Sequence, residues 1–166
     1  MKCRIPERQR QLDPRMRGLI RRQLGYCAEL TVAEVFGFGD KRICSIRDEV
    51  QRMYAEYDPK YPDTYDYTRA LLSLFGCDGG EYIYPVRAGS GEKVLYGREH
   101  DIVYLCYAYR LRLRGFGQVR IERFQTELCR RIRYYNEVFE GDYDSVIPVI
   151  ENKLAQRGIR VGGGQA

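Results

Sequence analysis

The chain has few of the residues on which most enzyme sites are built. His100 is the only histidine, and no serine or cysteine stands in a nucleophile motif that would pair with it. The six cysteines form no C-x-x-C pair, so the spacing of a zinc site is missing. There is no P-loop, and no G-x-G-x-x-G follows a strand. We therefore expect a protein without enzymatic activity, metal or cofactor.

Long apolar runs are missing as well. No apolar stretch approaches the roughly 18 residues that a transmembrane helix needs. The charged start, Met1 to Arg8, has no apolar run of the kind that signal peptides carry. With 44% apolar and 31% charged residues, the composition is that of a soluble globular protein. We expect a cytosolic protein that avoids membranes and keeps its cysteines as free thiols.

Lysine is scarce among the basic residues, with 5 Lys against 23 Arg. Residues 1–25 and 109–133 each hold eight basic and two acidic side chains. Together these windows carry a charge of +12, while the remainder of the chain carries −7. The guanidinium fork suits bidentate contacts with phosphate or carboxylate. The clustering therefore indicates a contact surface for a phosphate backbone or an acidic protein.

The most informative feature that is present is an internal repeat. From about residue 26 to residue 72, the residue at one position tends to recur 78 positions later, with no gap. Gly37-Phe38-Gly39 recurs as Gly115-Phe116-Gly117, and Arg42-Ile43 recurs as Arg120-Ile121. Such a period is the signature of a duplicated structural unit. A unit of this length is near the lower limit for burying its own core, so we expect the copies to pack against each other about a pseudo-two-fold axis.

The spacing of apolar residues predicts helices in both copies. The segment Ile102 to Tyr109 has the β-branched and aromatic composition of a strand, but its counterpart in the first copy has helical spacing, so we predict a helix. The Asp13-Pro14 pair predicts a helix start, and Asp40 is the predicted cap of the second helix. In the first copy the predicted helices are 14–36, one after Asp40 with an apolar stripe from Ile43 to Tyr57, and 68–75. In the second copy they are 101–113, one after the G-F-G turn with the stripe Ile121, Phe124, Leu128, Ile132 and Tyr135, and 144–157.

One insertion between the copies has no counterpart. Glu81 to Val86 and Lys93 to Tyr96 flank the turn-forming segment 88–91, which predicts a β-hairpin, and residues 159–161 are a candidate third strand. The predicted fold is mainly α, with tandem duplicated three-helix units packed about a pseudo-two-fold axis and one small β-hairpin insertion. The predicted segments are 1–14 (basic arm), 15–76 (helical repeat unit 1), 77–98 (β-hairpin insertion), 99–161 (helical repeat unit 2) and 162–166 (disordered tail), with both units in one compact domain.

The G-F-G turns between helices resemble the helix-hairpin-helix motif. That resemblance implies phosphate binding by main-chain N–H groups at a helix N-terminus, and two copies that straddle a duplex. The chain departs from the motif by having Ile43 and Ile121 where a small residue is usual, and Phe36 and Arg114 where proline is common. In the alternative interpretation, the first glycine of each turn ends a helix with positive φ and the phenylalanine fills the core.

The second copy holds the larger surplus of arginine, which makes it the predicted contact surface. Glu49 with Arg52, and Glu127 with Arg130, are spaced as intrahelical ion pairs. His100, at the predicted start of a helix, is expected to be a capping or surface residue. The candidate binding residues are Arg110, Arg112, Arg114, Gly115, Gly117, Arg120, Arg123, Arg130, Arg131 and Arg133 in the second copy, and Gly37, Gly39 and Arg42 in the first.

Two further stretches resemble small helical proteins of Firmicutes phages and prophages. They are the run from Gly37 to Ile43 before a helix, and the ending from Tyr143-Asp144 to Gly158-Ile159. The resemblance implies a phage or mobile-element product in the bacterial host cytoplasm and implies no particular chemistry. Three functions remain open: a non-enzymatic protein that binds nucleic acid or a nucleoprotein, an anti-CRISPR-type inhibitor that blocks a host CRISPR effector nuclease, and a scaffold that oligomerises, for example as a homodimer.

Overall fold

The computed structural model describes residues 14–60, 85 and 88–162. Within these residues the chain is helical and has no strand, which confirms the prediction of a mainly α fold. None of the described helices is both long enough and apolar enough to cross a membrane. The helices are α1 (Pro14–Phe36), α2 (Asp40–Lys60), α4 (Ser90–Leu113), α5 (Gln118–Phe139) and α6 (Tyr143–Gln156).

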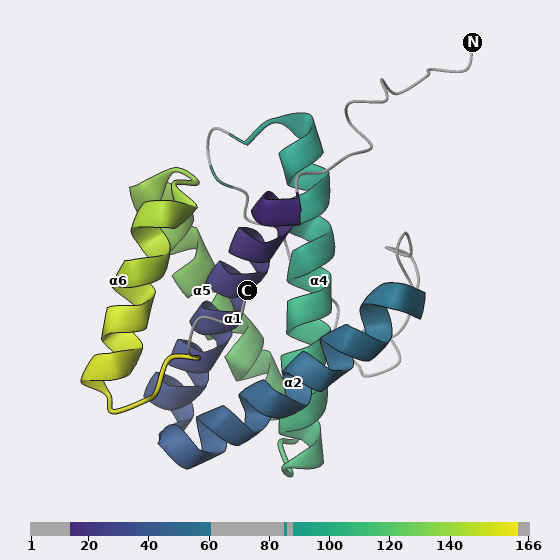
Figure 1. The fold of residues 1–166 in the computed structure, drawn as a ribbon. Helices are drawn as coiled ribbons and strands as arrows, with labels where there is room; N and C mark the ends of the chain where they lie inside the picture. The colour runs from purple at the N-terminus through teal and green to yellow at the C-terminus, as the bar shows by residue number, and fades with distance from the viewer. Residues whose placement is uncertain (1–13, 61–84, 86–87, 163–166) are drawn as a thin grey trace.

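Helices α1 and α4 lie side by side at the centre of the molecule (Figure 1). Helix α6 covers the outer side of α1, α5 packs behind α1, and α2 crosses α4 at the front of the view. The apolar stripe predicted for α5 is confirmed, because Ile121, Phe124, Leu128, Ile132 and Tyr135 are all buried. Each such side chain contributes about 1.5–3 kcal/mol when it is fully buried.

The two G-F-G turns end α1 and α4 in similar ways. Gly37 has a φ of +69° and Gly115 has a φ of +89°, a left-handed conformation that favours glycine at the end of a helix. Backbone hydrogen bonds close both turns, from Phe38 N to Val32 O at 3.5 Å and from Phe116 N to Leu111 O at 3.1 Å. Helices α2 and α5 then begin at Asp40 and Gln118, which are equivalent positions of the repeat.

The backbone at the second turn leads to a prediction about its two glycines. Gly115→Ala is expected to lower the free energy of unfolding by about 1–2 kcal/mol, because an L-residue is strained in the left-handed region. Gly117 has a φ of −77° and open space where a Cβ would stand, so Gly117→Ala is the matched control and should be nearly neutral. Urea unfolding of both variants checks this, and equal losses would contradict it.

Equivalent positions of the two copies touch each other along the centre of the molecule. Arg21 Nε donates to Glu99 Oε2 at 2.5 Å, and Tyr107 OH donates to Glu29 Oε1 at 3.0 Å. Arg21 precedes Glu29 in α1, and their partners Glu99 and Tyr107 follow in the same order in α4. The two helices therefore run in the same direction, as Figure 1 shows. Helices α1 and α4 therefore form a parallel central pair.

The predicted β-hairpin is wrong in its second strand. Residues 93–96 belong to α4, which begins at Ser90, well before the predicted start at Asp101. Leu95 and Tyr96 are buried on this helix, so packing favours helix for a segment whose local composition suits a strand. Gly89, with extended backbone (φ −71°, ψ 169°), precedes the helix instead of forming a hairpin turn. The first predicted strand lies outside the described residues apart from Pro85.

Other predictions differ from the structure near the ends of elements. Residues 159–161 form no strand, and α2 continues past its predicted end to Lys60. Asp40 is the first residue of α2 rather than a residue before it, whereas Asp142 does cap α6 by accepting from Ser145 N at 3.2 Å. The predicted arm at 1–13, the predicted helix at 68–75 and the tail from residue 163 lie outside the described residues.

Candidate functional site

The two G-F-G turns meet at one end of the molecule. The ring centroids of Phe38 and Phe116 are 5.8 Å apart, and those of Phe36 and Phe116 are 4.8 Å apart, both in edge-to-face contact. Phe38 and Phe116 are buried. The alternative interpretation of these turns is therefore confirmed for the phenylalanines and for the positive φ of both first glycines. We call this region, formed by residues 36–42 and 112–123, the turn end.

Three arginines stack on the aromatic rings of the turn end. The guanidinium carbon of Arg42 lies 4.3 Å from the Phe38 ring centroid, and that of Arg120 lies 5.3 Å from the Phe116 ring centroid. Arg123 lies 5.8 Å from the Phe36 ring centroid. None of the ion pairs in the described part of the chain involves these three arginines. A guanidinium over a ring is held by its charge, and its N–H groups can still donate to an anion.

Helix N-termini add positive potential to the turn end. Helix α5 has no side-chain cap at Gly117 and no acidic residue in its first turn. The first N–H groups of a helix lack intrahelical acceptors, and the helix dipole makes this end positive. Helix α2 also begins here but carries Asp40 in its first turn. Hydrogen bonding from the backbone N–H of Arg160 is the main cause that lowers the pKa of Asp40 below its ordinary value.

Two of the predicted binding residues instead tie α4 to α2. Arg114 donates to both oxygens of Glu49, at 2.8 Å and 3.2 Å, and Arg110 Nε lies 3.8 Å from Glu49 Oε2. The hydrogen bonds from Arg114 are the main reason that the pKa of Glu49 is lowered. The predicted pair of Glu49 with Arg52 is therefore replaced by a pair between helices.

The remaining predicted arginines lie apart from the stacked group or are engaged elsewhere. Arg131 donates to Glu34 at 2.5 Å and joins α5 to α1, and Arg112 donates to the side chain of Gln118. Arg130 forms the predicted intrahelical pair with Glu127 at 3.3 Å, and Arg133 is exposed farther along α5. The structure thus brings together Gly37, Gly39, Arg42, Gly115, Gly117, Arg120 and Arg123, and separates Arg130, Arg131 and Arg133 from them.

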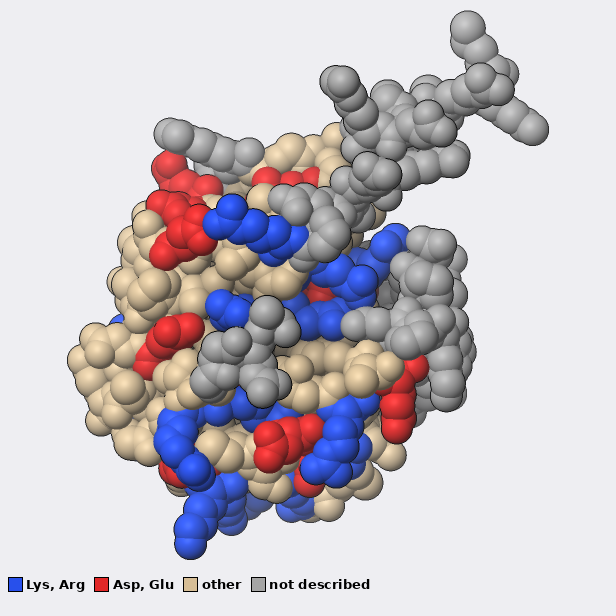
Figure 2. All heavy atoms as spheres, viewed as in Figure 1, with Lys and Arg blue, Asp and Glu red and all other residues tan. Residues whose placement is uncertain are grey.

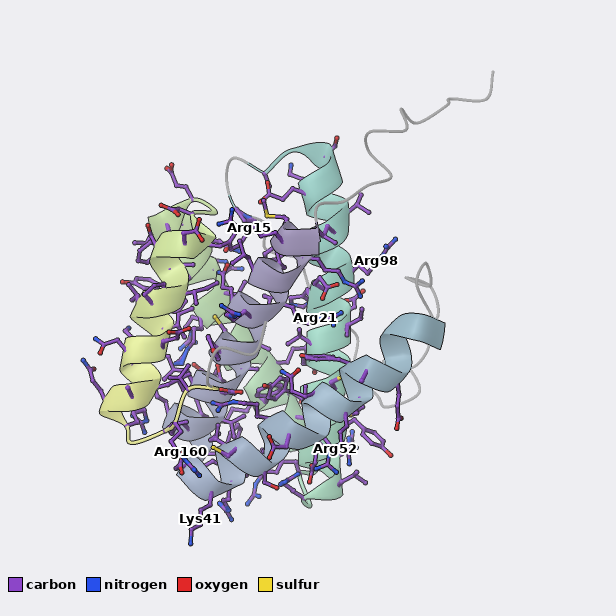
Figure 3. All side chains as sticks on the ribbon, viewed as in Figure 1. Arg15, Arg21, Lys41, Arg52, Arg98 and Arg160 are labelled. Atoms are coloured by element: carbon purple, nitrogen blue, oxygen red, sulfur yellow. The ribbon has the colours of Figure 1, made fainter. Side chains whose placement is uncertain are left out.

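Lys41 is a basic residue of the turn end that is absent from the residues predicted from the sequence. Figure 3 shows it at the start of α2, pointing away from the body of the molecule. On the face seen in Figure 2, Lys and Arg side chains gather at the same lower end, with acidic side chains between them. The signal that could have located this end is the repeated spacing of phenylalanine and arginine four positions apart, which lets the arginine fold back over the ring.

Two buried carboxylates were also missed, and both hold helices together. Glu99 is fully buried and accepts from Arg17 Nε at 2.7 Å as well as from Arg21. Glu29 accepts from Arg47 Nε and Nη2, each at 2.8 Å. Burial raises the pKa of Glu29, while its hydrogen bonds with Arg47 and Tyr107 act in the opposite direction. Because these groups are enclosed between helices, we assign them to stability and not to binding.

The single histidine is buried, which corrects the prediction of a capping or surface residue. His100 is 3% exposed and lies within α4, because that helix begins well before it, at Ser90. Among the described residues, no group of three or more histidine, cysteine, aspartate or glutamate side chains is placed to hold a metal ion.

Comparison of the chain with protein-family models, with curated proteins and with solved structures finds no match.

Proposed function

We propose that the chain is a binding protein whose turn end holds the phosphate backbone of a nucleic acid. The observation that carries the proposal is the arrangement of Arg42 and Arg120, each stacked on the phenylalanine of its own turn, with the two rings in contact. The rings fix the positions of both guanidinium groups, so less side-chain entropy is lost when they bind. Backbone N–H groups at the start of α5 would add donors that read no base.

The symmetry of the turn end favours a duplex as the ligand. The contacts between equivalent positions of α1 and α4 support two copies related by a pseudo-two-fold axis, which would place Arg42 and Arg120 at equivalent positions. A nucleic-acid duplex presents two strands with the same kind of relation. The stacking distances leave the two guanidinium carbons at most roughly 15 Å apart, which is close enough for both to contact phosphates of one duplex.

Fluorescence anisotropy with a labelled duplex of arbitrary sequence tests the proposal. Without base contacts we expect a Kd of about 1–100 µM near physiological salt, which falls steeply as salt is lowered. The unpaired single strands serve as the comparison, and duplex should bind more tightly if both stacked arginines engage at once. Absence of binding to either form at about 50 mM salt, where phosphate contacts are strong, would overturn the proposal.

An acidic protein is a second candidate partner, favoured by exposed aliphatic side chains beside the second turn. Val119 is 80% exposed and Leu113 is 60% exposed, and apolar groups beside arginine are typical of protein interfaces. A nucleic-acid-binding host protein, such as a CRISPR effector nuclease, is the alternative partner predicted from the sequence. A pull-down from bacterial lysate before and after nuclease treatment separates the candidates, because only a direct protein partner stays bound after the nucleic acid is digested.

A further inference from the structure

The segment after α6 lies across the start of α2. We call Arg157–Gly162 the strap. It leaves α6 at Gly158, where φ is +74°, and it buries Ile159. Hydrogen bonds to α1 and α2 fasten it, among them those from Arg157 Nη2 to Ala33 O at 3.2 Å and from Arg47 Nη1 to Arg160 O at 2.6 Å. Figure 3 shows the result, with Arg160 beside the beginning of α2 and near Lys41.

Arg160 engages both carboxylate oxygens of Asp40. Its backbone N–H donates to Oδ1 at 2.8 Å, and its side-chain Nε donates to Oδ2 at 2.9 Å. Cys44 Sγ lies 3.4 Å from Oδ1 on the other side. Asp40 is thus held by the strap and by its own helix, while the Arg160 side chain remains 75% exposed.

The position of Asp40 makes the two halves of the turn end electrically different. The equivalent position of the second copy is Gln118, which has no charge, so α5 begins without an acidic residue in its first turn. A carboxylate in the first turn of a helix occupies the positive potential that would otherwise attract a phosphate. It would also repel a phosphate that approaches the neighbouring Arg42. The guanidinium of Arg160 supplies the compensating charge at this point.

We propose that Arg160 is a positioning residue for phosphate binding: by neutralising and holding Asp40, the strap makes the α2 half of the turn end as receptive to phosphate as the α5 half. This inference rests on the proposed function. The buried pair of Glu29 and Arg47 supports this arrangement. Arg47 donates to Glu29 through Nε and Nη2, and to Arg160 O of the strap through Nη1.

A double-mutant cycle of Arg160→Gln and Asp40→Asn tests the inference, with anisotropy on the same duplex as the measurement. An uncompensated carboxylate cancels about one phosphate contact, so Arg160→Gln alone should weaken binding about fivefold to tenfold near 0.1 M salt and lower the salt slope by about 1. Adding Asp40→Asn to Arg160→Gln removes the uncompensated carboxylate and should restore the affinity of the unchanged protein. Asp40→Asn alone should bind as tightly as the unchanged protein or more tightly.

The outcomes separate this inference from the proposed function. If Arg160 touched phosphate directly, the double variant would stay weaker than the unchanged protein, which would overturn the positioning role. Equal affinity of Arg160→Gln and the unchanged protein would overturn it as well, and would leave the proposed function intact. Failure of the unchanged protein to bind any duplex would overturn both. Thermal unfolding of each variant identifies any loss that comes from a displaced strap, because such a loss would persist in the Asp40→Asn background.

Discussion

Arg47→Met is expected to lower the free energy of unfolding by about 3–5 kcal/mol, because it leaves a buried carboxylate without its charged partner. Glu29 is 2% exposed and accepts two hydrogen bonds from Arg47 and one from Tyr107. Methionine replaces most of the aliphatic volume of arginine, so the loss reports the charge and its hydrogen bonds more than a cavity. Urea unfolding at neutral pH, followed by circular dichroism, measures it.

Two further variants show whether burial is the cause. Arg130→Met removes an exposed ion pair with Glu127 on α5 and should cost less than about 1 kcal/mol. Adding Glu29→Gln to Arg47→Met removes the buried charge and should recover part of the lost stability. If Arg47→Met lowered the free energy of unfolding no more than Arg130→Met, the pair of Glu29 and Arg47 would contribute little to the stability of the fold.

Arg42→Gln together with Arg120→Gln is expected to weaken duplex binding about 50-fold near 0.1 M salt, and to reduce the slope of log K against log salt by about 2. Each substitution removes one guanidinium that the ring beneath it holds in place. Stability should change little, because exposed cation–π contacts contribute only about 0.5–1 kcal/mol each. Anisotropy titrations at four or five salt concentrations give both the affinity and the slope.

Arg133→Gln provides the matched control for charge. It removes the same formal charge from an exposed position on α5, about 20 Å along the helix from Arg120 at about 1.5 Å per residue. We expect at most a small change in affinity from this variant. An effect as large as that of Arg120→Gln would show that the contact surface runs along α5, as the charge clustering alone predicts, and is not confined to the turn end.

The helical nature of the fold was predictable because helical periodicity is strong in this chain. The stripe from Ile121 to Tyr135 is buried as predicted. The segment Ile102 to Tyr109 has a local composition that favours a strand, yet it lies in the middle of α4. Its helical state was predictable because its counterpart in the first copy has unambiguous helical spacing, so the repeat supplied information that local composition does not carry.

The start of α4 was not predictable for a physical reason. The run Ala88-Gly-Ser-Gly91 is equally compatible with a hairpin turn and with the start of a helix. Tertiary packing favours the helix, because Leu95 and Tyr96 are buried on α4, which begins at Ser90. Such packing is not encoded in any short window of sequence.

The candidate site could be predicted only as a region. An excess of arginine at residues 109–133 is visible in the sequence, but the arginines that remain available depend on pairs formed between helices. Glu49 lies 65 positions from Arg114 and Glu34 lies 97 positions from Arg131. No spacing rule connects such positions, whereas the stacking of Arg42 on Phe38 follows from a local spacing that repeats in both copies.

The central contacts between positions of α1 and α4 that lie 78 residues apart require the two helices to differ in sequence. Two identical chains packed in this way would place arginine against arginine at position 21 and glutamate against glutamate at position 29, both within the buried centre. In the joined chain, Arg21 meets Glu99 and Glu29 meets Tyr107. The residues at these contacts differ between the two helices and are complementary, so the core is asymmetric although similar G-F-G turns end α1 and α4.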